Sequence, residues 1–236
     1  MSATTPLEEL YRHAVTFPGA GVALGSLASV LTHVEEELER SAAQISLRVQ
    51  AKHARLGDDL HPEDKEYEEC ELERTTNALL PKVVRGGFIL TLWSTFEVAA
   101  LDITEYAHRE IGRPLNGDPF RNGGFLKNLD VVFTKSLGIP AFPDRGVFER
   151  LEELRLFRHA LVHHDGKVER LPATLRRATP EEYAVIGLHQ YGDLRHEYVV
   201  PNAAFTRQAL ELVTSYLVSL SERVYATLHP KPLTDA

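Results

Sequence analysis

An arginine and three histidines lie close together in the run Leu154-Arg-Leu-Phe-Arg-His-Ala-Leu-Val-His-His-Asp-Gly166. Within it, four residues separate Arg158 from His163. This spacing places a permanent cation and an imidazole, which titrates near neutral pH, within side-chain reach of each other. A helix with enough apolar residues of its own does not need such a cluster for packing, so chemistry on a phosphate group is the first hypothesis to weigh.

The element that must position this cluster is a predicted amphipathic helix over residues 147–164. Its apolar residues recur at helical spacing and indicate one buried face. A glycine directly after such a pattern favours a helix end, so we expect the helix to stop at Asp165-Gly166. The apolar residues are Leu151, Leu154, Phe157, Leu161 and Val162.

The Arg-x4-His pattern at a helix end, followed by a glycine turn, resembles the active-site signature of the HEPN superfamily (higher eukaryotes and prokaryotes nucleotide-binding domains). Leu92-Trp-Ser-Thr-Phe-Glu97 is similar to the first core helix of these domains. Val200-Pro-Asn-Ala-Ala-Phe205, before a long apolar segment, is similar to the start of their last core helix. The resemblance covers roughly residues 82–228. His159 stands where such proteins often have asparagine, and Asp165 stands where toxins paired with a nucleotidyltransferase antitoxin tend to have tyrosine.

This resemblance implies an all-α, HEPN-like helical bundle that cleaves RNA as a homodimer without a metal or other cofactor. It also implies a toxin or an anti-phage defence effector, with an antitoxin or a defence-system protein as a possible partner. Arg158 would stabilise the phosphate and His163 would act as acid or base, leaving a 2′,3′-cyclic phosphate. The supporting residues would be His159, His164, Asp165 and Glu97.

The chemistry of these side chains fits that reaction. The 2′-hydroxyl beside the scissile phosphate must lose a proton and the leaving 5′-oxygen must gain one, and an imidazole can serve either step. A guanidinium can stabilise the extra negative charge on the phosphorane through two hydrogen bonds. Five helical positions correspond to a rotation of about 140°, so the two side chains flank a stripe. Two such helices facing each other across a twofold axis would bring both pairs to one cleft.

Other interpretations of the same residues remain open. Arg158 could pair with Glu152 or Glu153, or cap carbonyl groups at the helix end. His159 and His163 have the i, i+4 spacing of a zinc or iron site. Further ligands for such a site could come from His164, Asp165, His189, His196 and Glu197. The alternative from a different functional class is a non-catalytic helical module that binds RNA, a nucleotide or a protein partner.

Composition favours a soluble globular protein of 236 residues, with 43% hydrophobic and 25% charged residues. The net charge is −8, yet the segment 121–177 holds eleven Lys/Arg and seven Asp/Glu, which favours an anion near the histidine cluster. Cys70 is the single cysteine, which excludes an intrachain disulfide and a cysteine-rich zinc site. We expect no signal peptide and no membrane span, because no apolar run approaches ~20 residues. A cytoplasmic location is therefore expected.

The remaining pattern predicts a mostly helical chain. We expect a short helix over 5–16, a long helix over 22–56 with coiled-coil spacing, and a charged helix from Pro62 with a break or kink at Pro81. Further helices are expected to end at 111, to span 125–137, and to run from Pro201-Asn202 to Leu228, with a β-hairpin over 184–200. We predict one HEPN-like domain over 1–236, in which 1–81 form an N-terminal helical elaboration, a long hairpin, and 82–228 the core bundle.

Overall fold

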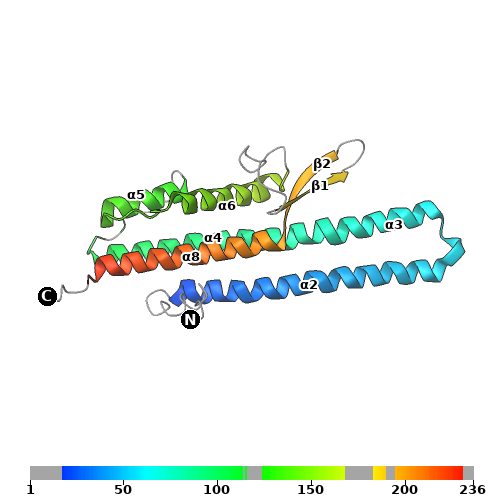
Figure 1. Cartoon of the computed structure of the whole chain (residues 1–236), viewed down its shortest axis with the longest axis horizontal. Helices are drawn as coiled ribbons and strands as arrows, with labels where there is room; N and C mark the ends of the chain where they lie inside the picture. The colour runs from blue at the N-terminus through cyan, green and yellow to red at the C-terminus, as the bar shows by residue number, and fades with distance from the viewer. Residues whose placement is uncertain (1–17, 114, 116–123, 168–182, 190–194, 231–236) are drawn as a thin grey trace. The chain divides into compact units, whose positions relative to one another are not determined.

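The computed structural model describes residues 18–113, 115, 124–167, 183–189 and 195–230. The short helix expected over 5–16 lies outside these residues. The described chain is mostly helical, which confirms the all-α class (Figure 1). Its α-helices are α2 (Pro18–Leu56), α3 (Pro62–Arg74), α4 (Leu80–Glu110), α5 (Phe125–Leu137), α6 (Arg145–His164) and α8 (Ala203–Leu228).

The chain divides into two compact units, and long helices contribute to both. Unit 1 comprises Met1–Leu27, Thr91–Arg155 and Gln208–Ala236. Unit 2 comprises Ala28–Leu90 and Leu156–Arg207. The division does not fall at residue 81, and the single HEPN-like domain stays a prediction.

Unit 2 contains a long helical hairpin made by α2 and α3. The 3₁₀ turn Gly57–Asp59 follows α2, and Gly57 has a positive φ of 52°. Pro62 then occupies the first position of α3, where its missing N–H costs no helical hydrogen bond. The two helices lie side by side, because Glu68 of α3 pairs with both Lys52 and His53 of α2 (Figure 1). These two helices form the long hairpin within residues 1–81.

The break expected at Pro81 takes a different form. A π-helical turn, Thr75–Leu79, precedes the proline, and the Leu80 N–H donates to the carbonyl of Thr75. Proline has no N–H and so cannot make the usual helical hydrogen bond. The wider π-helical turn before it accommodates this change, and the chain remains helical from Pro62 to Glu110.

This 49-residue helical span, Pro62–Glu110, is also long and apolar enough to cross a membrane by length and composition alone. Half of its most apolar window is buried inside the protein, and core helices of soluble proteins pass the same test. The cytoplasmic location stays a prediction.

A two-stranded antiparallel sheet in unit 2 confirms the expected pair of strands. β1 (Tyr183–His189) pairs with β2 (Arg195–Pro201), with Ile186 opposite Tyr198. The turn between them lies outside the described residues. The end of β2 leads directly to Asn202, whose side-chain oxygen accepts a hydrogen bond from the Phe205 N–H at 2.7 Å and caps α8.

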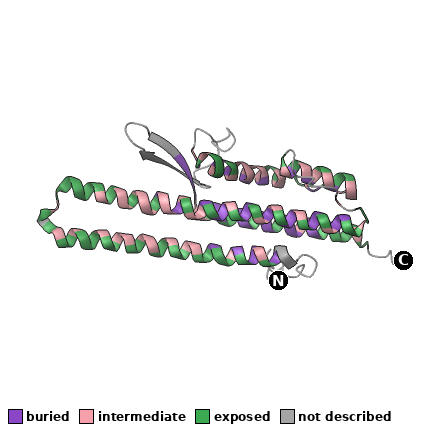
Figure 2. Ribbon diagram, turned by 180° about the vertical axis from the view of Figure 1, so that it is seen from behind, coloured by how far each residue is buried: buried purple, intermediate pink, exposed green. Residues whose placement is uncertain are grey.

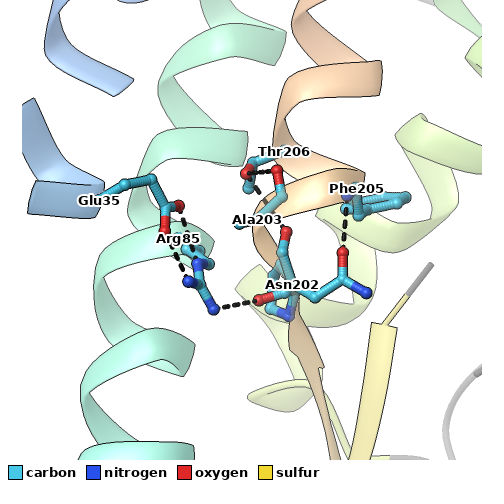
Figure 3. Close-up of polar contacts among 7 residues, drawn as sticks. Glu35, Arg85, Asn202, Ala203, Phe205 and Thr206 are labelled. Atoms are coloured by element: carbon cyan, nitrogen blue, oxygen red, sulfur yellow. Dashed lines mark hydrogen bonds and ion pairs between the residues drawn. The ribbon is translucent and has the colours of Figure 1, made fainter. Parts of the chain in front are cut away.

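A largely buried ion pair connects three segments of unit 2. Arg85 on α4 donates from Nε and Nη2 to the two carboxylate oxygens of Glu35 on α2, at 2.9 and 2.6 Å (Figure 3). Its Nη1 donates to the Pro201 carbonyl at 3.4 Å, at the junction of β2 and α8. One guanidinium therefore holds α2, α4 and the strand end in register.

Unit 1 has an aromatic core, consistent with the buried segments of α4 and α8 in Figure 2. Trp93 and Phe96 are almost fully buried, and their ring centroids lie 5.1 Å apart. Phe125 contacts both rings edge-on, and Tyr216 of α8 contacts Phe96 at 5.7 Å. Trp93 and Tyr216 are thus core residues.

Candidate functional site

Helix α6 presents the arginine and the histidines because its opposite side is committed to the core. Its buried positions recur every three residues, at Leu151, Leu154, Phe157 and Ala160. Within unit 2, the Phe157 ring packs on Phe205 of α8 with 4.8 Å between centroids. This packing fixes the rotation of α6, and with it the direction of the side chains on either side of Phe157.

The C-terminal end of α6 is built from two successive residues with left-handed backbone. Asp165 has φ 51° and Gly166 has φ 72°. The Gly166 N–H donates to the carbonyl of Ala160, which satisfies one of the carbonyls that a helix end leaves free. The Gly166 carbonyl accepts from the Val199 N–H at 3.0 Å, so the helix end is anchored to β2. The predicted glycine stop is confirmed.

Arg158 is half-buried, and its Nε has no hydrogen-bond partner among the residues that the structure describes. The two carboxylates that could have neutralised it are otherwise engaged. Glu152 accepts two hydrogen bonds from Arg155, each at 2.7 Å, and Glu153 accepts one from Arg150 at 2.9 Å. These contacts weaken the interpretation of Arg158 as one half of a local ion pair.

The three imidazoles gather at the end of α6. The ring centroids of His159 and His163 lie 4.4 Å apart, and those of His159 and His164 lie 5.8 Å apart. His159 and His163 are exposed, whereas His164 is half-buried. A substrate phosphate can therefore meet an accessible imidazole here.

Lys82 of α4 belongs to the same cluster and was not identified from the sequence. Its ammonium lies 2.8 Å from the Asp165 carboxylate and 4.3 Å from the centre of the Tyr198 ring. The Lys82 side chain is only 12% exposed, whereas that of Asp165 is 67% exposed. No local spacing predicts this contact, because residues 82 and 165 meet only through the packing of α4 against α6.

That packing is close. A Cβ placed on Gly86 of α4 would lie 3.9 Å from the side chain of Leu161 on α6. Since Gly86 is one turn beyond Lys82, the same face of α4 carries both the contact with Leu161 and the cation that reaches Asp165. Unit 2 thus gathers Arg158, the histidines, Asp165 and Lys82.

Glu97 has a different environment. It lies in unit 1, where its carboxylate accepts a hydrogen bond from the Trp93 indole nitrogen at 2.7 Å. That contact gives Glu97 a structural role beside the aromatic core. A supporting role toward Arg158 stays a prediction.

The metal-site alternative gains no geometric support. Within the part of the chain that the structure describes, no group of three or more His, Cys, Asp or Glu side chains is arranged to hold a metal ion. The side chains of His189, His196 and Glu197 lie outside the described residues, so ligands from the sheet stay a prediction.

Comparison with family models, with curated proteins and with solved structures finds no match to this chain.

Proposed function

We propose that this protein is a metal-independent endoribonuclease of HEPN type that acts as a homodimer, in a toxin or anti-phage defence role. The observation that carries the proposal is the state of Arg158. It is a half-buried cation with an unpartnered Nε, beside exposed imidazoles on one rigid helix. Because Arg150 and Arg155 bind the neighbouring carboxylates, the positive charge of Arg158 remains available to attract a phosphate group.

The reaction assigns a distinct task to each side chain. An imidazole removes the proton from the 2′-hydroxyl, whose oxygen then attacks phosphorus and forms the 2′,3′-cyclic phosphate. The bond from phosphorus to the 5′-oxygen breaks, and a protonated imidazole donates its proton to that leaving oxygen. His163 carries one of these transfers. The other falls to His159 or to His163 of a second copy, while Arg158 stabilises the phosphorane.

Lys82 and Asp165 act as positioning residues in this proposal. The ion pair holds the left-handed Asp165 against α4, next to the last turn of the catalytic helix. Because Asp165 is well exposed, the pair itself contributes at most ~1 kcal/mol to stability. Its effect on activity comes through the placement of His163 and His164.

The test is cleavage of RNA by the purified full chain in the presence of EDTA. Arg158→Ala and His163→Ala should each lower the rate by about 10²–10⁴, the range for loss of an acid/base group or a charge-stabilising donor. Arg145→Ala and His33→Ala are matched controls at exposed positions, and both should retain full activity.

Expression in cells gives a second readout. The wild type should be toxic and His163→Ala should not be. RNA binding without turnover would instead favour the non-catalytic module. Cleavage that stops in EDTA, or full activity in both site variants, would contradict the proposal.

A further inference from the structure

The helical hairpin of unit 2 buries little of its own surface. None of the described residues from Thr32 to Asn77 is buried, and the hairpin is green and pink in Figure 2. Two large apolar side chains of α2 are exposed as well, Val30 by 48% and Leu47 by 64%. Helices in proteins gain most of their stability from packing against other elements, so such a hairpin favours a partner that covers it.

The two exposed apolar residues share one face of α2 with a pair of opposite charges. Glu37 follows Val30 by seven residues, Arg40 follows Glu37 by three, and Leu47 follows Arg40 by seven. These spacings place the four side chains on one side of a helix, which we call the outer face of α2. Glu37 and Arg40 pair with each other, and each side chain is 53% exposed. The outer face therefore has apolar ends and a charged centre.

This pattern is complementary to itself when two copies of α2 run antiparallel. A twofold axis between residues 38 and 39 places Glu37 against the partner's Arg40, and the reciprocal pair lies on the other side of the axis. The same axis places Val30 against the partner's Leu47, so apolar side chains meet at both ends. The charge pattern therefore identifies a second copy of this chain as the partner.

Other arrangements of the same two helices match less well. In a parallel pairing, Glu37 would face the partner's Glu37 and Arg40 would face the partner's Arg40, and these like charges oppose association. An antiparallel pairing shifted by one heptad would place Val30 against Arg40, or Leu47 against Glu37. Of these arrangements, the unshifted antiparallel register alone joins opposite charges to each other and apolar side chains to each other.

We propose that two copies of this chain associate through the outer face of α2 in this antiparallel register. The contacts between Val30 and Leu47 bury apolar surface, and the central ion pairs fix the register, as polar residues do in a coiled-coil seam. The inference builds on the homodimer of the proposed function and gives it a specific interface. Association is measured by mass and not by RNA cleavage, so a failure of this interface is distinct from a failure of the nuclease.

Charge reversal on the full chain tests the interface by sedimentation velocity over a series of protein concentrations. A reducing agent is present, because the exposed Cys70 could otherwise link two chains. The wild type should dimerise. Glu37→Arg sets arginines against each other in both central pairs, and Arg40→Glu does the same with carboxylates. Each variant should therefore raise the Kd of the dimer by about 100-fold.

An equimolar mixture of these two variants gives a sharper test. The two arginines of one chain then face the two glutamates of the other, so the mixture should form a heterodimer at concentrations where neither variant dimerises alone. The double variant Glu37→Arg/Arg40→Glu keeps both central pairs with their charges exchanged, and it should dimerise like the wild type.

Glu63→Arg and Arg145→Glu are the matched controls. They make the same changes of charge at exposed positions away from the outer face, and both should dimerise like the wild type. Glu37 and Arg40 are half exposed in one chain, so the Tm of their variants should stay near the wild-type value. A monomeric wild type, single variants that dimerise like the wild type, or a mixture that stays monomeric would each overturn the proposal.

Discussion

Replacement of Arg85 by methionine provides a sharp test of how unit 2 is held together. The change keeps an apolar stem of similar length and removes the guanidinium that joins Glu35 to the Pro201 carbonyl (Figure 3). Glu35 then remains a charged group with a side chain only 19% exposed and no cation beside it. We therefore expect a large loss of stability from one substitution.

The size of that loss follows from the burial of the pair. Breaking a fully buried ion pair costs ~3–5 kcal/mol, because the remaining charge is left desolvated. Both side chains here keep about a fifth of their exposure, so we reduce the expected loss to about 2–3 kcal/mol. For a chain of this length, 1 kcal/mol corresponds to roughly 2–4 °C in Tm, so the expected decrease is about 4–12 °C.

A double-mutant cycle measured by urea unfolding isolates the pair itself. Glu35→Leu should lower the free energy of unfolding about as much as Arg85→Met, because it leaves the Arg85 guanidinium without its carboxylate partner. The double variant should recover most of the loss, because neither charge is then left unpaired. Arg145→Met is the matched control, an arginine on α6 whose pair with Glu149 is well exposed, and it should cost less than ~0.5 kcal/mol.

The reasoning would be refuted by single variants that each cost less than about 0.5 kcal/mol, or by losses that simply add in the double variant. Either result would mean that the guanidinium does not couple α2 to α4. The salt dependence gives a further check. The coupling should persist at 1 M salt, where the Debye length is ~3 Å and exposed pairs are screened.

Three other predictions concern the site and the hairpin. Gly166→Ala should destabilise the protein by about 1–3 kcal/mol in urea unfolding, because alanine must adopt φ 72° and its Cβ would lie 3.4 Å from the Val199 carbonyl; no loss would refute the anchored helix end. Lys82→Met should reduce RNA cleavage while changing Tm little, and a normal rate would remove Lys82 from the site. The pKa of Glu68 is lowered, first by its hydrogen bond with Lys52, so its stabilising effect is present above pH 4.5 and lost as pH falls through the lowered pKa. Wild type should therefore exceed Glu68→Gln in Tm at pH 7 but match it in strong acid, and a constant difference would contradict this.

The sequence predicts the end of α6 well because the signals are local. The apolar spacing of residues 151–161 and the Asp165-Gly166 pair lie within a few turns, and the structure places the helix end at His164. The same holds for the start of α3 at Pro62 and the end of α5 before Gly138, which has φ 69°.

Contacts between distant segments are not predictable in this way. Lys82 meets Asp165, and Arg85 meets Glu35, only because α4 packs against elements far away in the sequence. Patterns of residue spacing along the sequence cannot predict these pairs. The π-helical turn before Pro81 shows the related limit, since the sequence marks where a helix is strained but not which turn absorbs the strain.

The measurement that tests the proposed function most directly is cleavage, in EDTA, of a defined RNA whose cut position has been mapped, compared with the same RNA carrying one 2′-deoxy nucleotide there. If Arg158 and His163 promote attack by the 2′-oxygen, the unmodified RNA yields a 2′,3′-cyclic phosphate and a 5′-hydroxyl, and the deoxy substitution abolishes that cut. Persistence of the cut in the deoxy substrate, or products with a 3′-hydroxyl and a 5′-phosphate, would contradict it.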